Sequence, residues 1–501
     1  MLDEDGRRHR SRAAPALALA LASALAAAPA WGRDPSPRRL AKAIDAILSR
    51  PEFAPALWGV EVRSLATGRT LYARNAEKAF RPASSMKLVT SAAALDAFGP
   101  EARIRTTVET AGRIDGFGRV LGDVFLVGRG DPNLSARFSP GRPTAAFEAM
   151  ADALAAAGVR RIEGRLIGHE GAFTGDRRGS GWTWEDLAWG YGTEVSALSF
   201  SDNRADVALS PGERPGDPVL LDVMPDTGCL SITSAVVTAE ATPAGEAGEG
   251  DGVTLVREPG SNDVRLDGRL PIGTTWEDGL AVSDPARCAV RVFQQVLQAK
   301  GIRVSGGAAT SSGPLPAGAR VLAAHEGAAM AEMVRVVNKR SQNLHAEMLL
   351  RLLGLRAKGE GTADAGHEAV AAFLARLGVP DAGWGRTDGS GLARTNLLTP
   401  AGLVSLLTAM DRHPQAAAFR ESFPIAGIDG TLEKRMRGTP AEGRVLGKTG
   451  TLNQASALAG YVTTVHGERL AFAILVNNHA GRGREGVEAI DAIATALAKS
   501  R

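Results

Sequence analysis

The chain of 501 residues is too long for one hydrophobic core, so we expect it to divide into two or three domains. Hydrophobic residues make up 44% of it and charged residues 23%, a composition that can bury ample apolar area and excludes a disordered protein. The formal net charge is +3, and no run of Lys and Arg follows the first dozen residues. We therefore expect no binding to nucleic acid through its phosphates.

Residues 1–30 are predicted to be a secretory signal peptide. Four arginines between residues 7 and 12 precede the apolar stretch AAPALALALASALAAAPA, which ends in the small-residue pattern Ala28-Pro29-Ala30. The alternative is an N-terminal membrane anchor, but the stretch is short and rich in alanine for a membrane span. No later segment has 18 uninterrupted apolar residues. We expect an exported, periplasmic protein, soluble or loosely associated with membrane or cell wall, with no membrane span after signal cleavage.

In the first half of the mature chain, the pattern of apolar residues changes near residue 101. Helical apolar spacing over residues 35–50 is followed by WGVEVRSLATGRTLYARN, which predicts two strands around a turn at 66–68. SSMKLVTSAAALDAF then predicts a helix that ends at Gly99-Pro100. From residue 101 to about 281, short β-like runs alternate with Gly, Pro and Asp, and we expect one helix near residues 143–157. This part is typical of one or two β-rich domains.

The second half returns to long helical patterns and closes with strands. Helices are predicted over residues 285–299, 329–338, 341–354, 362–377 and 399–412 and over the final 484–499. The stretches RVLGKTGT, ALAGYVTTV and RLAFAILVNN predict three strands. We therefore expect one mixed domain built from residues 31–105 and 282–501, interrupted by β-rich inserted domains at 106–281.

The chain contains two cysteines, Cys229 and Cys288. After export they would meet an oxidising compartment, where disulfides persist. They have neither CxxC nor metal-ligand spacing. One disulfide and two buried unpaired thiols both remain open.

The stretch RPASSMKLVTS, residues 81–91, holds a candidate nucleophile. On a helix, residues three apart share a face, so Lys87 reaches Ser84 and points away from Ser85. A serine hydroxyl becomes a good nucleophile only when a base takes its proton, and a lysine serves if burial or a nearby positive charge lowers its pKa. Lysine supplies only 9 of the 58 basic residues, which makes this lysine more informative. The alternative is an ordinary helix start with a solvated lysine.

Two further motifs favour the catalytic interpretation. NKRSQNLHAE places Ser341 and Asn343 at a predicted helix start, and VLGKTGTL places Lys448 on a probable strand. The order S-x-x-K, S-x-N, K-T-G is the signature of the penicillin-recognising serine enzymes. By contrast, no HExxH is present, and His345 and Glu347 lie on different faces of their predicted helix, so a zinc peptidase is disfavoured.

The chain resembles the D-alanyl-D-alanine carboxypeptidase/endopeptidase family, the class C low-molecular-mass penicillin-binding proteins, over nearly its whole mature length. The supporting stretches are PASSMKLVT, GRGDPNLS, GWTWED, VSALSFSDN, NKRSQNLHAE, DGSGLARTN, FPIAGIDGTLEKR and GKTGTL. The resemblance implies an α+β multidomain fold. A β-lactamase/transpeptidase-like domain, with an antiparallel sheet between helical layers, would be interrupted by two β-rich inserted domains.

Catalytic roles follow from the chemistry and the resemblance together. Ser84 would attack the carbonyl between two D-alanines while Lys87 takes its proton, and water would later hydrolyse the acyl-enzyme. Ser341 would relay a proton to the leaving amine. Asn343 would hold both the Lys87 amine and the substrate amide, and Lys448 would add positive potential that favours a neutral Lys87 and an anionic substrate.

The resemblance also implies substrate-binding residues. Thr449 and Thr451, on either side of Gly450, would bind the terminal carboxylate with their hydroxyls. The backbone N–H of Thr451 would join that of the nucleophile in an oxyanion hole. Arg394 would lie near the far end of the donor peptide, with a surface salt bridge as the alternative. Asp176 would meet the amino group of a diaminopimelate side chain, with a loop cap as the alternative.

These residues predict an exported serine DD-peptidase of peptidoglycan metabolism. It would remove the terminal D-alanine from stem peptides, could cleave D-alanyl-diaminopimelate cross-links, and would bind β-lactams covalently, with no cofactor and no metal. One alternative is a β-lactamase or esterase of the same superfamily, although no glutamate stands in an obvious deacylating-base motif. The other is a catalytically silent wall-binding protein, which would need none of the five catalytic residues. The oligomeric state and the role of the inserted domains stay open.

Overall fold

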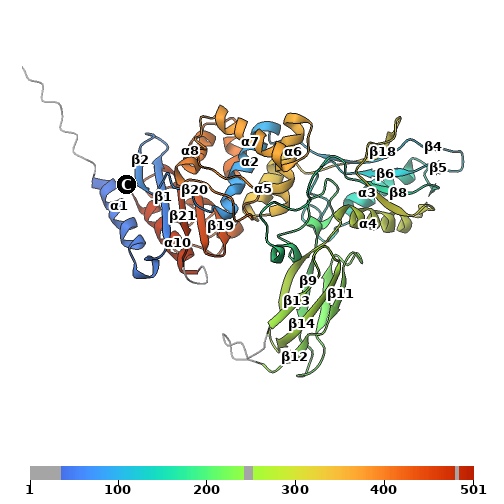
Figure 1. Cartoon of the computed structure of the whole chain (residues 1–501), viewed down its shortest axis with the longest axis horizontal. Helices are drawn as coiled ribbons and strands as arrows, with labels where there is room; N and C mark the ends of the chain where they lie inside the picture. Colours follow the sequence, from blue (N-terminus) through green and yellow to red (C-terminus); the bar gives the residue numbers. More distant parts are fainter. Residues whose placement is uncertain (1–34, 242–251, 480–483, 501) are drawn as a thin grey trace, which may run out of the picture.

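The computed structural model describes residues 35–241, 252–479 and 484–500. The predicted signal peptide at residues 1–30 lies outside these ranges. Figure 1 shows an elongated molecule, with both ends of the described chain gathered at one end and the inserted part at the other. Over the described ranges, no helix is long and apolar enough to cross a membrane.

A five-stranded antiparallel sheet joins the two ends of the chain. The strand order is β19-β20-β21-β1-β2, and β1 pairs with β21 along its whole length. Strand β19 forms one edge of this sheet. The strands are β1 (Leu57–Ser64), β2 (Thr70–Arg74), β19 (Val445–Leu452), β20 (Ala455–Thr463) and β21 (Arg469–Asn477).

Helices cover both faces of this sheet. Side chains alternate along β21, so that Phe472 and Ile474 face α1 (Pro35–Leu48) and α10 (Arg484–Lys499), while Ala471, Ala473 and Leu475 face the other helical layer. That second layer contains α2 (Lys87–Phe98), α5 (Met330–Lys339), α6 (Asn343–Lys358), α7 (Ala363–Arg376), α8 (Pro400–Asp411) and α9 (Ala416–Glu421). An antiparallel sheet between two helical layers is the arrangement that the family resemblance implied.

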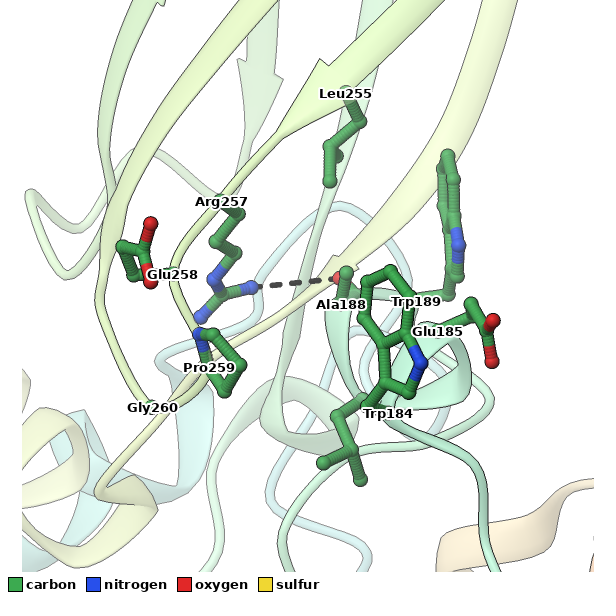
Figure 2. A pocket seen from close by; sticks show the side chains of 10 residues that line it. Trp184, Glu185, Ala188, Trp189, Leu255, Arg257, Glu258, Pro259 and Gly260 are labelled. Carbon is green, nitrogen blue, oxygen red and sulfur yellow. Dashed lines mark hydrogen bonds between the residues drawn. The ribbon is translucent and has the colours of Figure 1, made fainter.

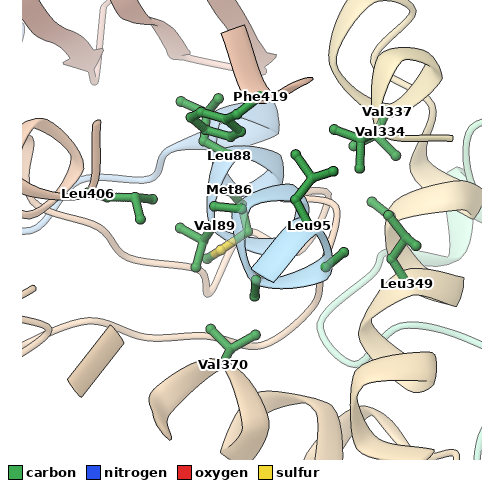
Figure 3. Packing of buried hydrophobic residues seen from close by; sticks show 14 of the residues in the cluster. Met86, Leu88, Val89, Leu95, Val334, Val337, Leu349, Val370, Leu406 and Phe419 are labelled. Carbon is green, nitrogen blue, oxygen red and sulfur yellow. The ribbon is translucent and has the colours of Figure 1, made fainter. Parts of the chain in front are cut away.

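Helix α2 is buried on nearly every side. Figure 3 shows Leu88, Val89 and Leu95 surrounded by side chains from α5, α6, α7, α8 and α9. A helix that is apolar all round belongs in a core rather than at a surface. The surrounding helices therefore fix the position of the first turn of α2, where the S-x-x-K motif lies.

The inserted part forms two bodies. The first contains a five-stranded sheet, a small sheet, and helices α3 (Ala145–Ala156) and α4 (Pro285–Ala299) around one core. The five-stranded sheet has β17 (Ala308–Ser311), β8 (Leu166–His169), β6 (Val124–Val127), β3 (Arg105–Thr110) and β18 (Arg320–Glu326). The small sheet has β16 (Arg303–Val304), β7 (Arg161–Ile162), β5 (Arg119–Leu121) and β4 (Arg113–Ile114).

The second body is all β and projects from the molecule in Figure 1. Two small sheets enclose a separate core that includes Leu209, Leu266 and Leu280. Their strands are β9 (Arg204–Ser210), β10 (Leu220–Met224), β11 (Ser231–Ser234), β12 (Val237–Ala239), β13 (Gly252–Val256), β14 (Asp263–Pro271) and β15 (Trp276–Ala281). A disulfide between Cys229 and Cys288 ties this body to α4. The structure thus decides between the two states left open for the cysteines.

The inserted part extends beyond the limit expected at residue 281. Strands β16, β17 and β18 pair with strands that precede residue 170, and α4 packs on the same core. We therefore propose that the insertion ends near residue 326, after which the chain returns to the catalytic layers through α5.

Candidate active site

The S-x-x-K motif begins on a 3-10 turn rather than on the α-helix that was predicted. Residues Ala83–Met86 form the 3-10 helix η2, and α2 starts at Lys87. A 3-10 helix has three residues per turn, so side chains at i and i+3 eclipse one another. The Lys87 Nζ accordingly lies 3.0 Å from the Ser84 Oγ. Ser85 is buried, and its hydroxyl has no hydrogen-bond partner in the part of the chain that the structure describes.

The Lys87 amine is completely buried and has three neighbours. Its Nζ donates to the Asn343 Oδ1 and to the backbone carbonyl of Ser390, each at 2.6 Å, and faces the Ser84 Oγ. A neutral amine has two hydrogens and one lone pair. When both hydrogens are held by the two carbonyl oxygens, the lone pair is directed at the serine hydroxyl.

Burial of Lys87 is the reason why its amine can be neutral. Loss of hydration lowers the pKa of Lys87 to about 7, while the negative charges of Asp388 and Glu347 act in the opposite direction. Near pH 7 a sizeable fraction of Lys87 therefore carries no proton and is able to accept one. An exposed lysine, with its pKa near 10.4, would be almost fully charged.

The S-x-N motif lies at the start of α6, across from η2. Ser341 has a φ of 58°, a left-handed conformation that is uncommon outside glycine, and the Gln342 side chain caps the helix by accepting from the Leu344 N–H. Asn343 then uses its Oδ1 for Lys87, and its Nδ2 donates to the Tyr191 carbonyl at 2.7 Å. The side chain is thereby fixed from two sides.

Lys448 is the second buried amine of the site. Its Nζ donates to the Ser341 Oγ and to the Thr449 carbonyl, each at 2.8 Å. Burial, followed by the positive charge of Lys87, lowers the pKa of Lys448 well below its usual range. Repulsion between the two amines acts on both, so each proton on one of them favours the neutral form of the other.

Gly450 lets the edge strand β19 approach η2 closely. A Cβ at this position would lie 2.5 Å from the Pro82 carbonyl oxygen and 3.2 Å from the Ser84 nitrogen. Gly450 therefore allows a close backbone contact between β19 and the turn that carries Ser84. Because β19 is an edge strand, one side of its backbone near Thr451 is open to a ligand.

A pocket of about 710 Å³ opens over these groups. Its lining includes Ser84, Ser341, Asn343, Arg394 and Thr451. The Arg394 guanidinium donates to the Asp186 Oδ2 at 3.0 Å on the pocket wall. Thr449 is not part of this lining, and its hydroxyl donates to the Thr431 Oγ1 at 2.8 Å. All three motifs thus contribute residues to one cavity, and the Lys87 and Lys448 amines lie behind its lining, in contact with the Ser84 and Ser341 hydroxyls.

The structure does not bring Asp176 to this pocket. The side chain is exposed, and its Oδ1 accepts a hydrogen bond of 2.9 Å from the backbone N–H of Arg178. Asp176 lines a different pocket of about 250 Å³, together with Glu170 and Arg351. Its side chain caps a turn, as the alternative held, and it is not part of the site.

The 3-10 helix η3 (Trp184–Ala188) separates the site from a smaller pocket of about 230 Å³. Asp186 faces the site, whereas Trp184 is 72% exposed and covers the smaller pocket. Figure 2 shows Trp184 opposite Arg257, whose guanidinium donates to the Ala188 carbonyl at 3.4 Å. The η3 segment therefore links the active-site wall to the projecting β body.

The fold and the site together define a serine acyl-transfer enzyme with a β-lactamase/transpeptidase-like domain. The chain belongs to the D-Ala-D-Ala carboxypeptidase 3 (S13) family, whose sequence model matches residues 40–498.

The chain is also similar to individual known proteins. The chain is 38% identical over 475 residues to a D-alanyl-D-alanine carboxypeptidase of Actinomadura sp. (strain R39), covering 92% of this chain and 84% of that one. It is 26% identical to a D-alanyl-D-alanine carboxypeptidase of Haemophilus influenzae, covering 79% and 80%. Penicillin binding protein 4 of H. influenzae has the same fold, with a TM-score of 0.78 at 24% identity over 91% of this chain and 98% of that one. The predicted family, fold class and serine-type carboxypeptidase class are confirmed.

The sequence did not indicate Asp388 or the Ser390 carbonyl as part of the site, and Glu347 was considered only as a zinc ligand and set aside. Asp388 and Ser390 stand in DGSGLARTN, which contributed to the resemblance through its arginine. An aspartate followed by two nearby glycines is a signal of a tight, capped loop, and it could have directed attention to this segment.

Proposed function

We propose that the protein is an exported peptidoglycan DD-peptidase that acts through an acyl-enzyme on Ser84. The observation that carries this proposal is the Lys87 amine, whose two hydrogens are held by Asn343 and Ser390 and whose third neighbour is the Ser84 Oγ. No solvated helix-start lysine would have such an environment.

In the proposed acylation, the Ser84 Oγ attacks the carbonyl carbon between the last two D-alanines. The hydroxyl proton passes to Lys87 as the O–C bond forms. The tetrahedral oxyanion is held by the backbone N–H groups of Ser84 and Thr451. When the C–N bond breaks, the leaving amine takes a proton through Ser341, which contacts Lys448. Water then hydrolyses the ester and regenerates the serine.

The substrate's free carboxylate is proposed to lie near the K-T-G strand. Thr451 lines the pocket and presents its hydroxyl there, while Thr449 would have to turn from Thr431 to reach the same ligand. Arg394 lies on the wall beside η3, where it can meet the far end of the donor peptide. Asn343 retains one amide hydrogen beyond its bond to Tyr191 for the substrate backbone.

Cleavage of cross-links uses the same chemistry. The leaving group is then a diaminopimelate amine in place of free D-alanine, so the nucleophile, base and oxyanion donors are unchanged. The pocket of about 710 Å³ supports this proposal because it leaves room beyond a single D-alanine. An endopeptidase of Bdellovibrio bacteriovorus shares the fold, with a TM-score of 0.51 at 16% identity over 88% of this chain and 93% of that one.

Covalent binding of β-lactams is proposed on the same grounds. The strained lactam amide occupies the place of the D-alanyl amide, and Ser84 opens it to an ester. A structure of penicillin binding protein 4 of H. influenzae in complex with a β-lactam supports this proposal at the level of the fold.

The first test is intact-mass analysis of the protein after mixing with benzylpenicillin. A lasting adduct is expected on the wild type and on the matched control Ser85→Ala, and none on Ser84→Ala. Hydrolysed penicillin without an adduct would support a β-lactamase instead. Intact penicillin without an adduct would point to an esterase or to a silent wall-binding protein.

The second test separates the two peptidase activities. Purified wild type is incubated with a pentapeptide that ends in D-alanyl-D-alanine and, separately, with a cross-linked dimer peptide. Release of D-alanine from the first is the expected carboxypeptidase activity. Cleavage of the dimer by the wild type but not by Ser84→Ala would support the endopeptidase, and an intact dimer would contradict that part of the proposal.

A further inference from the structure

Beneath Lys87 lie two buried carboxylates that have no part in the acylation steps described above. Glu347 is 1% exposed and lies on α6, one turn after Asn343. Asp388 is also 1% exposed and lies in the loop that follows α7. Buried carboxylates are costly unless they are hydrogen-bonded or paired, so their partners indicate what they do.

Glu347 holds the backbone of the loop at the point where it contacts Lys87. Its Oε1 accepts from the Gly389 N–H at 2.9 Å and from the Ser390 N–H at 2.8 Å. Its Oε2 lies 3.4 Å from the Arg351 Nη1, one helical turn further along α6. The residue whose N–H it fixes is the same residue whose carbonyl accepts a hydrogen from the Lys87 amine.

Asp388 fixes the same loop from the other side. Its Oδ1 accepts from the Gly391 N–H at 2.6 Å and from the Asn396 Nδ2 at 2.7 Å. Its Oδ2 accepts from the Ala393 N–H at 2.7 Å and from the Trp182 Nε1 at 2.9 Å. Both carboxylate oxygens of Asp388 are therefore fully engaged in hydrogen bonds with this loop and with Trp182.

We propose that Glu347 is a positioning residue for the general base: it fixes the Ser390 carbonyl that orients the Lys87 amine, and its carboxylate charge favours the protonated form of that amine. The inference rests on the proposed acylation of Ser84 and deepens it. Asp388 supports the same loop, while Glu347 contributes both a backbone anchor and a charge.

The charges that face Lys87 come from three elements. Glu347 belongs to α6, Asp388 to the loop and Lys448 to β19. The two carboxylates favour the charged amine, and Lys448 and burial oppose it. Glu347 itself is affected in turn, because burial and the charge of Asp388 raise its pKa to about 7, while Arg351 lowers it. Its ionisation and that of Lys87 are therefore coupled in one pH range.

The signs of these charges give the direction in which the pKa of Lys87 changes when Glu347 is replaced. Removal of the Glu347 charge takes away a group that stabilises protonated Lys87, so the pKa of Lys87 must fall. More of the neutral base is then present around and above pH 7, where Glu347 of the wild type is ionised. The rising limb of the acylation rate against pH should move to lower pH.

The test is the rate of acylation by benzylpenicillin as a function of pH, followed by intact mass, in the full-length protein. Glu347→Gln keeps an oxygen for the Gly389 and Ser390 N–H groups but removes the charge. We expect its rising limb to lie about one pH unit below that of the wild type, which is about tenfold in rate at a fixed pH on the limb. Glu347→Asp keeps the charge but shortens the reach to the loop. We expect its limb to stay in place and its plateau rate to fall.

Glu61→Gln is the matched control, because Glu61 is a buried carboxylate paired with an arginine, Arg63, outside the site. Its pH profile should coincide with that of the wild type. A folded Glu347→Gln with an unmoved limb would overturn the inference on charge. If Glu347→Gln has no thermal unfolding transition, Glu347→Asp decides alone, since an unchanged plateau would overturn the positioning role. Absence of any adduct on the wild type would instead refute the proposed function.

Discussion

At the scale of single residues, the proposed chemistry depends on two amines that are kept away from water. Lys87 and Lys448 are both fully buried, yet each has hydrogen-bond acceptors for its hydrogens. Their charges repel one another, so a proton on one amine disfavours a proton on the other. The catalytic value of Lys87 therefore comes from its environment, since the same side chain in water would remain charged.

Lys87→Arg tests whether this amine is the base. A guanidinium cannot lose its proton in a protein, and its planar fork does not match the three neighbours of the amine. We expect a folded protein whose acylation by benzylpenicillin is slowed by about 10² to 10⁴-fold, the usual contribution of a general base. The measurement is the time course of the intact-mass adduct at pH 8. Near-normal acylation would remove Lys87 from the mechanism.

Asp131, in the GRGDPNLS stretch, provides a pH prediction for stability. Burial raises the pKa of this carboxyl to about 7, although its Oδ1 accepts from the Asn133 N–H at 3.0 Å. The folded state thus retains a proton that the unfolded chain loses near pH 4, and stability falls as pH rises from about 4 to 7. Asp131→Asn removes this loss, which amounts to at most about 4 kcal/mol for three pKa units.

We expect the melting temperature of Asp131→Asn, relative to that of the wild type, to be higher at pH 8 than at pH 5. Differential scanning calorimetry at the two pH values measures this difference. Asp206→Asn is the control, because Asp206 is an exposed aspartate whose change should have no such pH dependence. Equal differences at both pH values would show that Asp131 is ionised in the folded protein.

Residue spacing predicted the choice of Ser84 over Ser85, and the order of the three motifs, a signature of the penicillin-recognising serine enzymes, predicted that they act together at one site. It could not predict the Ser390 carbonyl, because a backbone oxygen has no signature in a sequence. It also could not place Asp176, since the path of a surface loop decides whether a carboxylate faces a pocket or caps a turn. Contacts within one helical turn are therefore predictable, and contacts between loops are not.

At the scale of elements, the site is formed where a 3-10 turn, a helix start, a loop and an edge strand meet. At two positions, glycines allow the backbones of these elements to approach one another closely. Gly450 brings β19 against η2, and Gly391, with a φ of 84°, brings the loop against the Ala83 carbonyl. A Cβ on Gly391 would lie 1.9 Å from that oxygen, closer than atoms can approach.

Gly391→Ala should therefore displace the loop and the nucleophile's turn relative to one another. We expect acylation to fall by about 10²-fold, as for other small misplacements of catalytic groups. Gly438→Ala is the matched control, because Gly438 has a φ of 68° but no atom within 4 Å of its Cβ position. Both variants carry the same left-handed strain of about 1 to 2 kcal/mol. Equal acylation rates in the two variants would contradict the steric argument.

The sequence patterns located the long helices closely, as for the predicted helix 285–299 and the observed α4 (Pro285–Ala299). The start of α2 was less accurate, because the 3-10 turn η2 has nearly the same side-chain spacing as an α-helix. The pairing of strands could not be predicted from the sequence. Strands β8 and β17 pair in parallel although more than a hundred residues separate them, and nothing local in either strand specifies its partner.

At the scale of the whole molecule, the inserted bodies are connected to the catalytic layers at several points. The wall residue Asp186 and the exposed Trp184 share η3, and α4 packs with the inserted sheets rather than with the catalytic helices. The helical sequence pattern after residue 284 had led us to expect that the chain returns to the catalytic domain at residue 282. Helical periodicity shows that a helix has an apolar face, but not which core that face covers.

The disulfide allows a test of this arrangement. Cys229 and Cys288 are separated by 59 residues and join the projecting body to α4. We expect the double variant Cys229→Ser/Cys288→Ser to lose about 2 to 4 kcal/mol in the free energy of unfolding, seen as a lower melting temperature. Acylation of Ser84 at 25 °C should be unchanged, because the bond lies outside the catalytic layers. Treatment of the wild type with a reductant should reproduce the loss, and an unchanged melting temperature in both would contradict it.

The pairing of β1 with β21 has a consequence for how the enzyme becomes active during its synthesis. Ser64 of β1 lies opposite Leu470 of β21. Strand β1, which is synthesised early, therefore cannot pair within the central sheet until β21, one of the last strands, has been made. The K-T-G strand also belongs to this late part of the chain. An incompletely synthesised chain thus contains the nucleophile without the sheet that positions it. The fold therefore delays completion of the proposed site until strands β19 to β21 have been made.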